Sequence, residues 1–127
     1  MSSNVVHLFD KPHIRTTGEF DAGKMYSISP AAIIKMSEKA ICMKGSIFSE
    51  TEPSRWNYSL DCWFPKSQLM GVYVPGWLFA AKAKTARQLL CNEDKFIAEA
   101  DAGYVLVREF FIVIDEVKIN LDDACTG

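Results

Sequence analysis

The chain has 127 residues, of which 49% are hydrophobic and 24% charged, so it has the size and composition of one soluble domain with a single core. The net charge of −2 divides unevenly: residues 1–92 carry 11 Lys/Arg and 7 Asp/Glu, whereas residues 93–127 carry 3 and 9. A typical duplex-DNA binder has a dominant basic footprint, which this sequence lacks. The sequence also shows no signal peptide and no apolar run of about 20 residues, so we expect a cytoplasmic protein that does not cross a membrane.

The spacing of the cysteines and histidines indicates neither a metal site nor a cofactor site. Structural zinc requires four nitrogen or sulfur ligands that converge in pairs from short spacings. The sequence has no Cys-x-x-Cys pair, and its two histidines lie near the N-terminus. We therefore expect reduced and mostly buried thiols at the four cysteines, Cys42, Cys62, Cys91 and Cys125.

The first third of the chain predicts an arm, a turn and a strand. Residues 1–24 mix turn formers and charges with little periodicity, which is typical of an N-terminal arm. Ser29 and Pro30 predict a short helical or irregular turn, because Ser is a good N-cap and Pro fits the first helical position. We expect a strand from about Glu38 to Phe48.

The clearest strand pattern runs from Trp56 to Phe64, where apolar and polar residues alternate until Trp63 breaks the rule. Pro65 ends this strand, because proline has no N–H for the sheet. Residues 69–74 are predicted as the return strand of a hairpin. Trp63 is either covered by a helix or exposed as a binding anchor.

The second half predicts two helices and a long strand. A helix is expected from Pro75–Trp77 to about Leu90, and a second from Glu93 to Ala100. The predicted inner side of the first helix holds Trp77, Leu78, Ala81, Thr85, Gln88 and Leu89. Residues 104–114 predict a long strand, with 115–120 as a candidate extension. The predicted fold is α+β: residues 25–120 form one domain, an antiparallel sheet of four to five strands packed against one or two helices, followed by an acidic tail at 121–127.

No pattern in the sequence commits the chain to catalysis. Residues 110–116 (FFIVIDE) look like a Walker B strand, but the glycine-rich loop that would cradle phosphates is missing. A Cys or Ser nucleophile would lack a nearby histidine as base, since both histidines lie in residues 1–24. A paired-carboxylate site in residues 115–123 stays open beside the simpler interpretation of a solvated acidic edge. We expect a protein that is not an enzyme.

Three short segments stand out together: residues 38–41 (EKAI), 63–68 (WFPKSQ) and 74–78 (VPGWL). They span about residues 36–80 and resemble the pattern EKAI … WxPKSQ … VPxWL of small proteins encoded by phages and other mobile elements. The chain departs from that pattern with an additional loop at 50–55 (ETEPSR) and a long acidic C-terminal third. The resemblance implies a phage or mobile-element protein that acts in the cytoplasm of a bacterial host cell without a cofactor.

The first functional hypothesis is a non-enzymatic protein-binding module that blocks or modulates a host nucleic-acid-handling system, as an anti-CRISPR inhibitor does. Its acidic C-terminal third would oppose a basic DNA or RNA channel, because complementary charge steers docking. An exposed Trp63 beside Lys66 would supply the apolar anchor of a binding hot spot. We expect a monomer or homodimer that binds a host protein or nucleoprotein complex through Trp63, Lys66, Gln68, Glu93, Asp94, Glu99, Asp101, Asp115, Glu116, Asp122 and Asp123.

Two alternatives stay open. An accessory single-stranded nucleic-acid-binding protein of phage replication or recombination would stack bases on aromatic side chains and hold phosphates with cations. Its residues would be Trp56, Trp63, Lys66, Lys82, Lys84 and Arg87. A virion or assembly component would instead pair the long strand at 104–114 with a second copy through an unprotected strand edge.

Overall fold

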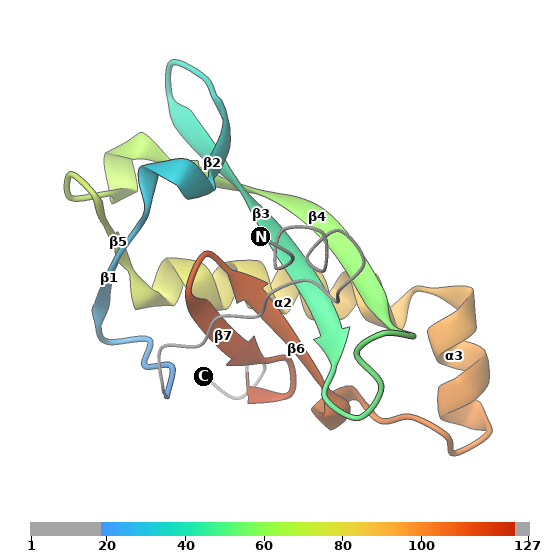
Figure 1. Ribbon diagram of the computed structural model, residues 1–127. Coiled ribbons are helices and arrows are strands. Elements are labelled where there is room, and N and C mark those ends of the chain that lie inside the picture. The colour runs from blue at the N-terminus through green and yellow to red at the C-terminus, as the bar shows by residue number, and fades with distance from the viewer. Residues whose placement is uncertain (1–18, 124–127) are drawn as a thin grey trace, which may run out of the picture.

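The computed structural model describes residues 19–123, which form an α+β fold (Figure 1). Within this range, seven strands and two α-helices build a five-stranded antiparallel sheet, a separate two-stranded sheet and a helical layer. The predicted fold class is therefore confirmed. Residues 1–18 of the predicted arm and residues 124–127 of the predicted tail lie outside the described part of the chain.

The long strand β3 (Ala40–Ser49) organises the five-stranded sheet. One edge of β3 pairs along its length with β4 (Asn57–Pro65), and the two predicted strands in this region are confirmed to within two residues. The other edge of β3 is shared end to end by β2 (Ile33–Met36) and β6 (Phe110–Ile114). Strand β7 (Val117–Asn120) continues the sheet beyond β6.

The main core lies between the sheet and α2 (Gly76–Cys91), as the alternation of β4 requires. Phe64 of β4 is fully buried, and its ring centroid lies 5.3 Å from that of Phe79 in α2. The shorter helix α3 (Asp94–Asp101) joins this core through Phe96, whose ring lies edge-on to Trp56 and Phe110. No helix in residues 19–123 is long and apolar enough to span a bilayer.

The predicted hairpin between the Trp56–Phe64 strand and residues 69–74 is wrong. The chain leaves β4 at Pro65 through a 3₁₀ helix, η2 (Lys66–Gln68), which turns it away from the sheet. The following strand β5 (Tyr73–Pro75) pairs with β1 (Met25–Ser27) in the two-stranded sheet. Strand β2, which follows the 3₁₀ turn η1 (Pro30–Ala32), is not among the predicted strands, because its four residues carry too little alternation to identify.

The α2 helix was predicted with correct ends but the wrong inner side. Its buried residues are Gly76, Leu78, Phe79, Ala83, Ala86 and Leu90. Of the predicted inner residues only Leu78 is buried, and Trp77 is 51% exposed. The small side chains of Ala83 and Ala86 are both fully buried, which lets the helix backbone lie close to the sheet.

The predicted strand at 104–114 is confirmed at residues 110–114, which form β6, but it begins too early, because the chain forms the 3₁₀ helix η3 (Val107–Glu109) before β6. Residues 115–120 do not extend β6 but reverse into β7 through the two-residue turn Asp115-Glu116. Asp115 has φ 55°, a left-handed conformation that Asp tolerates. Since β6 pairs with β3 on one side and β7 on the other, it has no free edge for a second copy.

Candidate functional site

An apolar groove of about 370 Å³ lies at the end of the molecule away from α3. Figure 1 shows the two segments that form its walls, η1 with β2 and the chain between β4 and β5, side by side at this end. The buried side chains of Ile28 and Ile41 lie between them. The first wall contributes Pro30, Ile33 and Met36, and the second Lys66, Leu69, Gly71 and Val72.

The second wall begins with the WFPKSQL segment, whose local chemistry explains its shape. Pro65 has φ −65° and lacks an N–H, so β4 stops there and η2 begins. The Lys66 amide donates to the Lys39 carbonyl at 2.8 Å, which ties η2 to the start of β3. The Leu69 amide closes the 3₁₀ turn on the Lys66 carbonyl at 3.1 Å. Lys66 and Leu69 are thereby both placed at the groove.

A tight turn completes the second wall. Met70 and Tyr73 exchange two backbone hydrogen bonds, of 2.9 and 3.0 Å, around Gly71 and Val72. Gly71 has φ +63°, the left-handed conformation that such turns require and that glycine adopts without strain. The Ile28 amide donates to the Val72 carbonyl at 2.8 Å, linking the turn to the groove floor. Backbone hydrogen bonds therefore fix the groove in its open form.

Large apolar side chains are exposed around the groove. Met36 is 61% exposed and Val72 51%, and both line it. Met70 and Tyr73, in the same turn as Val72, are 69% and 49% exposed. Clusters of exposed large apolar residues mark interaction sites in soluble proteins. The exposed Lys66 is the one charged side chain of the lining, and it forms no ion pair with any residue between 19 and 123.

The other predicted anchors lie near this groove without lining it. Gln68 is exposed on the same 3₁₀ turn as Lys66. Trp63 is 39% exposed and pairs with Cys42 of β3, so it points to the sheet face opposite Phe64 and α2. A smaller apolar cluster, Phe48, Phe111 and Val113, lies on this same outer face.

The predicted acidic residues occupy three separate places. The first set belongs to α3 and its N-cap and comprises Glu93, Asp94, Glu99 and Asp101. Asp115 and Glu116 form the β6–β7 turn, and Asp122 and Asp123 follow β7. The α3 helix packs at the Phe110 end of β6, whereas the turn lies beyond Ile114, roughly 13 Å further along the strand. The structure does not gather the eight acids on one continuous surface.

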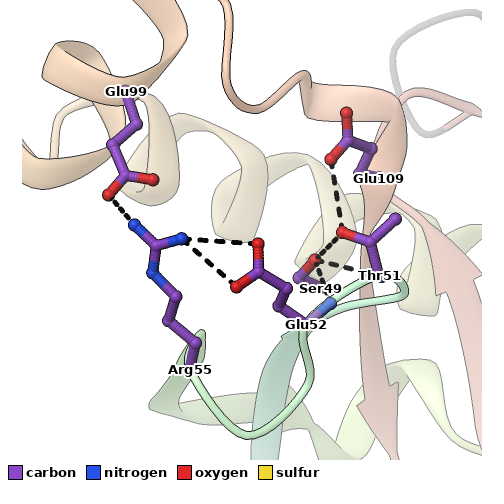
Figure 2. Close-up of polar contacts among 6 residues, drawn as sticks. All are labelled: Ser49, Thr51, Glu52, Arg55, Glu99 and Glu109. Carbon is purple, nitrogen blue, oxygen red and sulfur yellow. Dashed lines mark hydrogen bonds and ion pairs between the residues drawn. The ribbon is translucent and has the colours of Figure 1, made fainter.

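Several of these acids already have partners within the fold. The Asp115 carboxylate accepts a hydrogen bond of 3.0 Å from the Ser29 amide. Asp122 lies 4.0 Å from the guanidinium of Arg87. Glu99 forms an ion pair with Arg55, which also binds Glu52 (Figure 2). Their side chains therefore contribute to the fold before any partner binds.

Figure 2 shows that the Arg55 ion pairs belong to a structural network at the β3–β4 turn. The buried hydroxyl of Ser49 accepts hydrogen bonds of 3.2 Å from the amides of Thr51 and Glu52. The Thr51 hydroxyl contacts Glu109 of η3 at 3.4 Å, and Arg55 reaches α3. The network joins the turn to both elements that follow α2.

The residues of the nucleic-acid alternative do not form one surface. Trp56 is 1% exposed and packs in the core, so it is not available to stack on a base. Lys82, whose ammonium lies 5.7 Å from the Phe64 ring centroid, is on the α2 side of the sheet, opposite Trp63. Lys84 is exposed on α2, and Arg87 is the partner of Asp122. Trp63 and the α2 cations thus lie on different faces.

The described thiols are buried or half-buried, as expected, and the two buried ones are held in their neutral form. Burial raises the pKa of Cys62 to about 11. Burial and the nearby Asp61 carboxylate raise the pKa of Cys42. In residues 19–123 no group of three or more His, Cys, Asp or Glu side chains could hold a metal ion.

Sequence reasoning found Lys66 but missed most of the groove. Ile28, Met36 and Val72 come from segments with weak periodicity, and their approach depends on the β1–β5 pairing, which the sequence did not predict. One usable signal was the presence of large apolar residues such as Ile33 and Met36 in the segment after Ser29 and Pro30, which was expected to be a turn. No protein-family model, no curated protein and no solved structure matches this chain. The resemblance of residues 36–80 to phage and mobile-element proteins therefore stays a prediction.

Proposed function

We propose that this protein is a protein-binding module that contacts its partner through the apolar groove and the exposed side chains around it. The observation that carries the proposal is a preformed apolar groove with Met36, Met70, Val72 and Tyr73 exposed at or beside it. Burial of such side chains at an interface is the main source of binding free energy, at about 25 cal/mol per Å² of apolar surface. A rigid groove also lowers the entropic cost of association.

The three segments behind the phage resemblance support the same location. Ile41 of the EKAI segment and Lys66 of the WFPKSQ segment both line the groove. The VPGWL segment begins in β5, directly after the turn that forms the second wall. The proposed setting is therefore a phage or mobile-element protein that blocks or modulates a host nucleic-acid-handling system by occupying a surface of one of its proteins.

The acidic residues have a secondary place in this proposal. The α3 group, with Asp94 and Asp101 exposed, would steer the chain towards a basic partner by long-range attraction. The groove lies at the other end of the molecule and would make the desolvated contact. Groove substitutions are therefore expected to change the dissociation rate, whereas charge reversal on α3 is expected to change the association rate and its salt dependence.

Site-specific photo-crosslinking tests the proposal with two exposed tyrosines as a matched pair. Tyr73 lies beside the groove at 49% exposure, and Tyr104 lies after α3 at 74% exposure. Each is replaced in turn by benzoylphenylalanine, which exchanges the hydroxyl for the same benzoyl group at both positions, and the full-length protein is irradiated in bacterial cells. We expect one cross-linked protein partner from position 73 and none from position 104.

Nuclease treatment before and after irradiation separates the protein partner from nucleic acid. A cross-linked protein that survives nuclease treatment and forms only at position 73 supports the proposal. Cross-links from position 104 alone would move the interface to α3. Products that disappear with nuclease would indicate the single-stranded nucleic-acid binder.

A further inference from the structure

The groove combines an apolar lining with one cation, and this combination specifies what it binds. We infer that it takes a large apolar side chain of the partner with a carboxylate next to it, so that the recognised element is a short acidic segment of a partner protein. This inference rests on the proposed function and adds the chemistry of the bound segment. It is carried by the position of Lys66 among apolar lining residues such as Ile33, Leu69 and Val72.

The size of the groove suits one or two side chains of a partner. Its volume of about 370 Å³ exceeds twice the roughly 150 Å³ of a cavity that holds one benzene molecule, which is room for one or two large apolar side chains. Ile28 and Ile41 close its floor and are 8% and 4% exposed. Met36 and Val72 stay exposed at its walls, where their side chains can contact an inserted side chain.

The charge beside the groove selects for an anion. Lys66 is the only ionisable lining residue, and within residues 19–123 no carboxylate pairs with it. The neighbouring cation Lys35 differs, because it already binds Asp61 at 2.8 Å. A single ammonium acts as a point charge that can pair with one carboxylate, whereas bidentate recognition of a carboxylate or phosphate uses the planar fork of arginine.

Methyl NMR on the full-length protein tests this inference with two matched peptides. The probes are N-acetyl-Leu-Leu-Glu-amide and N-acetyl-Leu-Leu-Gln-amide, which differ only in the terminal carboxylate. The reporters are the methyl groups of Met36 and Met70 at the groove, with Met25, outside the lining, as an internal reference. We expect shifts at Met36 and Met70 with both peptides, and about twofold to fivefold tighter binding of the glutamate peptide, as an exposed ion pair provides.

Lysine variants assign the preference to one side chain. Lys66→Met keeps the apolar stem and removes the charge, so it is expected to bind the two peptides equally. Lys44→Met is the control, because Lys44 is exposed on β3 and is not part of the lining, and it is expected to keep the preference. Equal binding of both peptides to the unmodified protein would overturn the carboxylate part of the inference.

The outcomes separate this inference from the proposed function. Cross-linking at Tyr73 without any peptide shift at Met36 or Met70 would overturn the acidic-segment inference and leave the proposed protein-binding function standing. If neither the cross-link from position 73 nor the peptide shifts are observed, both the acidic-segment inference and the proposed protein-binding function are overturned. A preference for the glutamate peptide that persists unchanged in Lys66→Met would overturn the assignment of carboxylate recognition to Lys66.

Discussion

At Gly76, the first residue of α2, the backbone of residues 21 and 22 passes very close to the helix. A Cβ at this position would lie 2.4 Å from the carbonyl oxygen of Asp21 and 2.9 Å from the Cα of Ala22. The Gly76 amide also donates to the Lys24 carbonyl at 2.7 Å. Because these neighbours are backbone atoms, they cannot yield as a side-chain end does. The glycine of the VPGWL segment is therefore a packing requirement of the fold.

Gly76→Ala is expected to lower the free energy of unfolding by about 2 to 3 kcal/mol, at the upper part of the usual range for overpacking. Urea denaturation of the full-length protein measures this change. Gly45→Ala is the control, because its closest neighbours are the flexible ends of Cys62, Ile112 and Leu60, and about 1 kcal/mol is expected. Equal losses of unfolding free energy in the two variants would contradict the explanation that backbone atoms at Gly76 leave no room for a Cβ.

The buried thiol of Cys62 makes the free energy of unfolding fall as the pH becomes alkaline. Its thiol has a pKa of about 11 in the folded chain against an ordinary value of 9.0, because burial penalises the thiolate. Below pH 9 the thiol is neutral in both states and stability is unaffected. Between about pH 9 and 11 the unfolded chain ionises first, so stability falls, by on the order of 2 kcal/mol in total. Above pH 11 this contribution has been lost.

Cys62→Ala should therefore flatten the pH dependence of unfolding between about pH 9 and 11, even if the smaller side chain lowers stability at neutral pH. Part of the slope remains, because burial also raises the pKa of Tyr58. Urea unfolding midpoints of both proteins across this window provide the test. An unchanged slope would mean that the Cys62 thiol ionises in the folded chain as readily as in the unfolded one.

Among the elements, the β3–β4 turn depends on one buried hydroxyl. Ser49 is fully buried, and its Oγ accepts from the amides of Thr51 and Glu52, which otherwise lack partners at the strand end. Ser49→Ala leaves these donors unsatisfied and is expected to cost about 1 to 2 kcal/mol. Amide hydrogen exchange at residues 51 and 52 should accelerate, because the turn opens more often.

Ser59→Ala is the matched control for the turn. Ser59 is exposed on β4, so its replacement should change stability by less than about 0.5 kcal/mol. If Ser49→Ala and Ser59→Ala were equally mild, the turn would be held by the Arg55 ion pairs and not by the hydroxyl.

An element can be predicted from the sequence when its own residues show which face is buried. It cannot be predicted in this way when it depends on pairing with a distant segment. The alternation from Trp56 to Phe64 is enough to predict β4, because one face must be buried. The partner of β5 is not predictable in this way, since three residues carry no register and the choice of β1 is tertiary. In α2, Ala83 and Ala86 are buried and Trp77 is exposed, so side-chain size does not identify the buried face of this helix. The groove depends on these unpredicted pairings, so Lys66 alone could be identified.

At the scale of the whole molecule, the two ends have different characters. The α3 end is acidic, and the ion pair between Arg55 and Glu99 joins it to the β3–β4 turn. The other end presents the apolar groove, fixed by backbone hydrogen bonds and bearing Lys66. We propose that the acidic end steers association and the apolar end binds, so that the groove is the contact surface for a partner protein.

The most direct test compares two neighbouring residues of β2 in their effect on affinity for the partner cross-linked at position 73. Met36, 61% exposed, lines the groove, whereas Ile34, 47% exposed on the same strand, does not. By calorimetry, Met36→Asp should weaken binding by about tenfold or more, because it places a carboxylate where the partner's apolar side chain and carboxylate must lie. Ile34→Asp should stay within about twofold of the unmodified protein. Equal effects of the two substitutions, or none from Met36→Asp, would contradict the account.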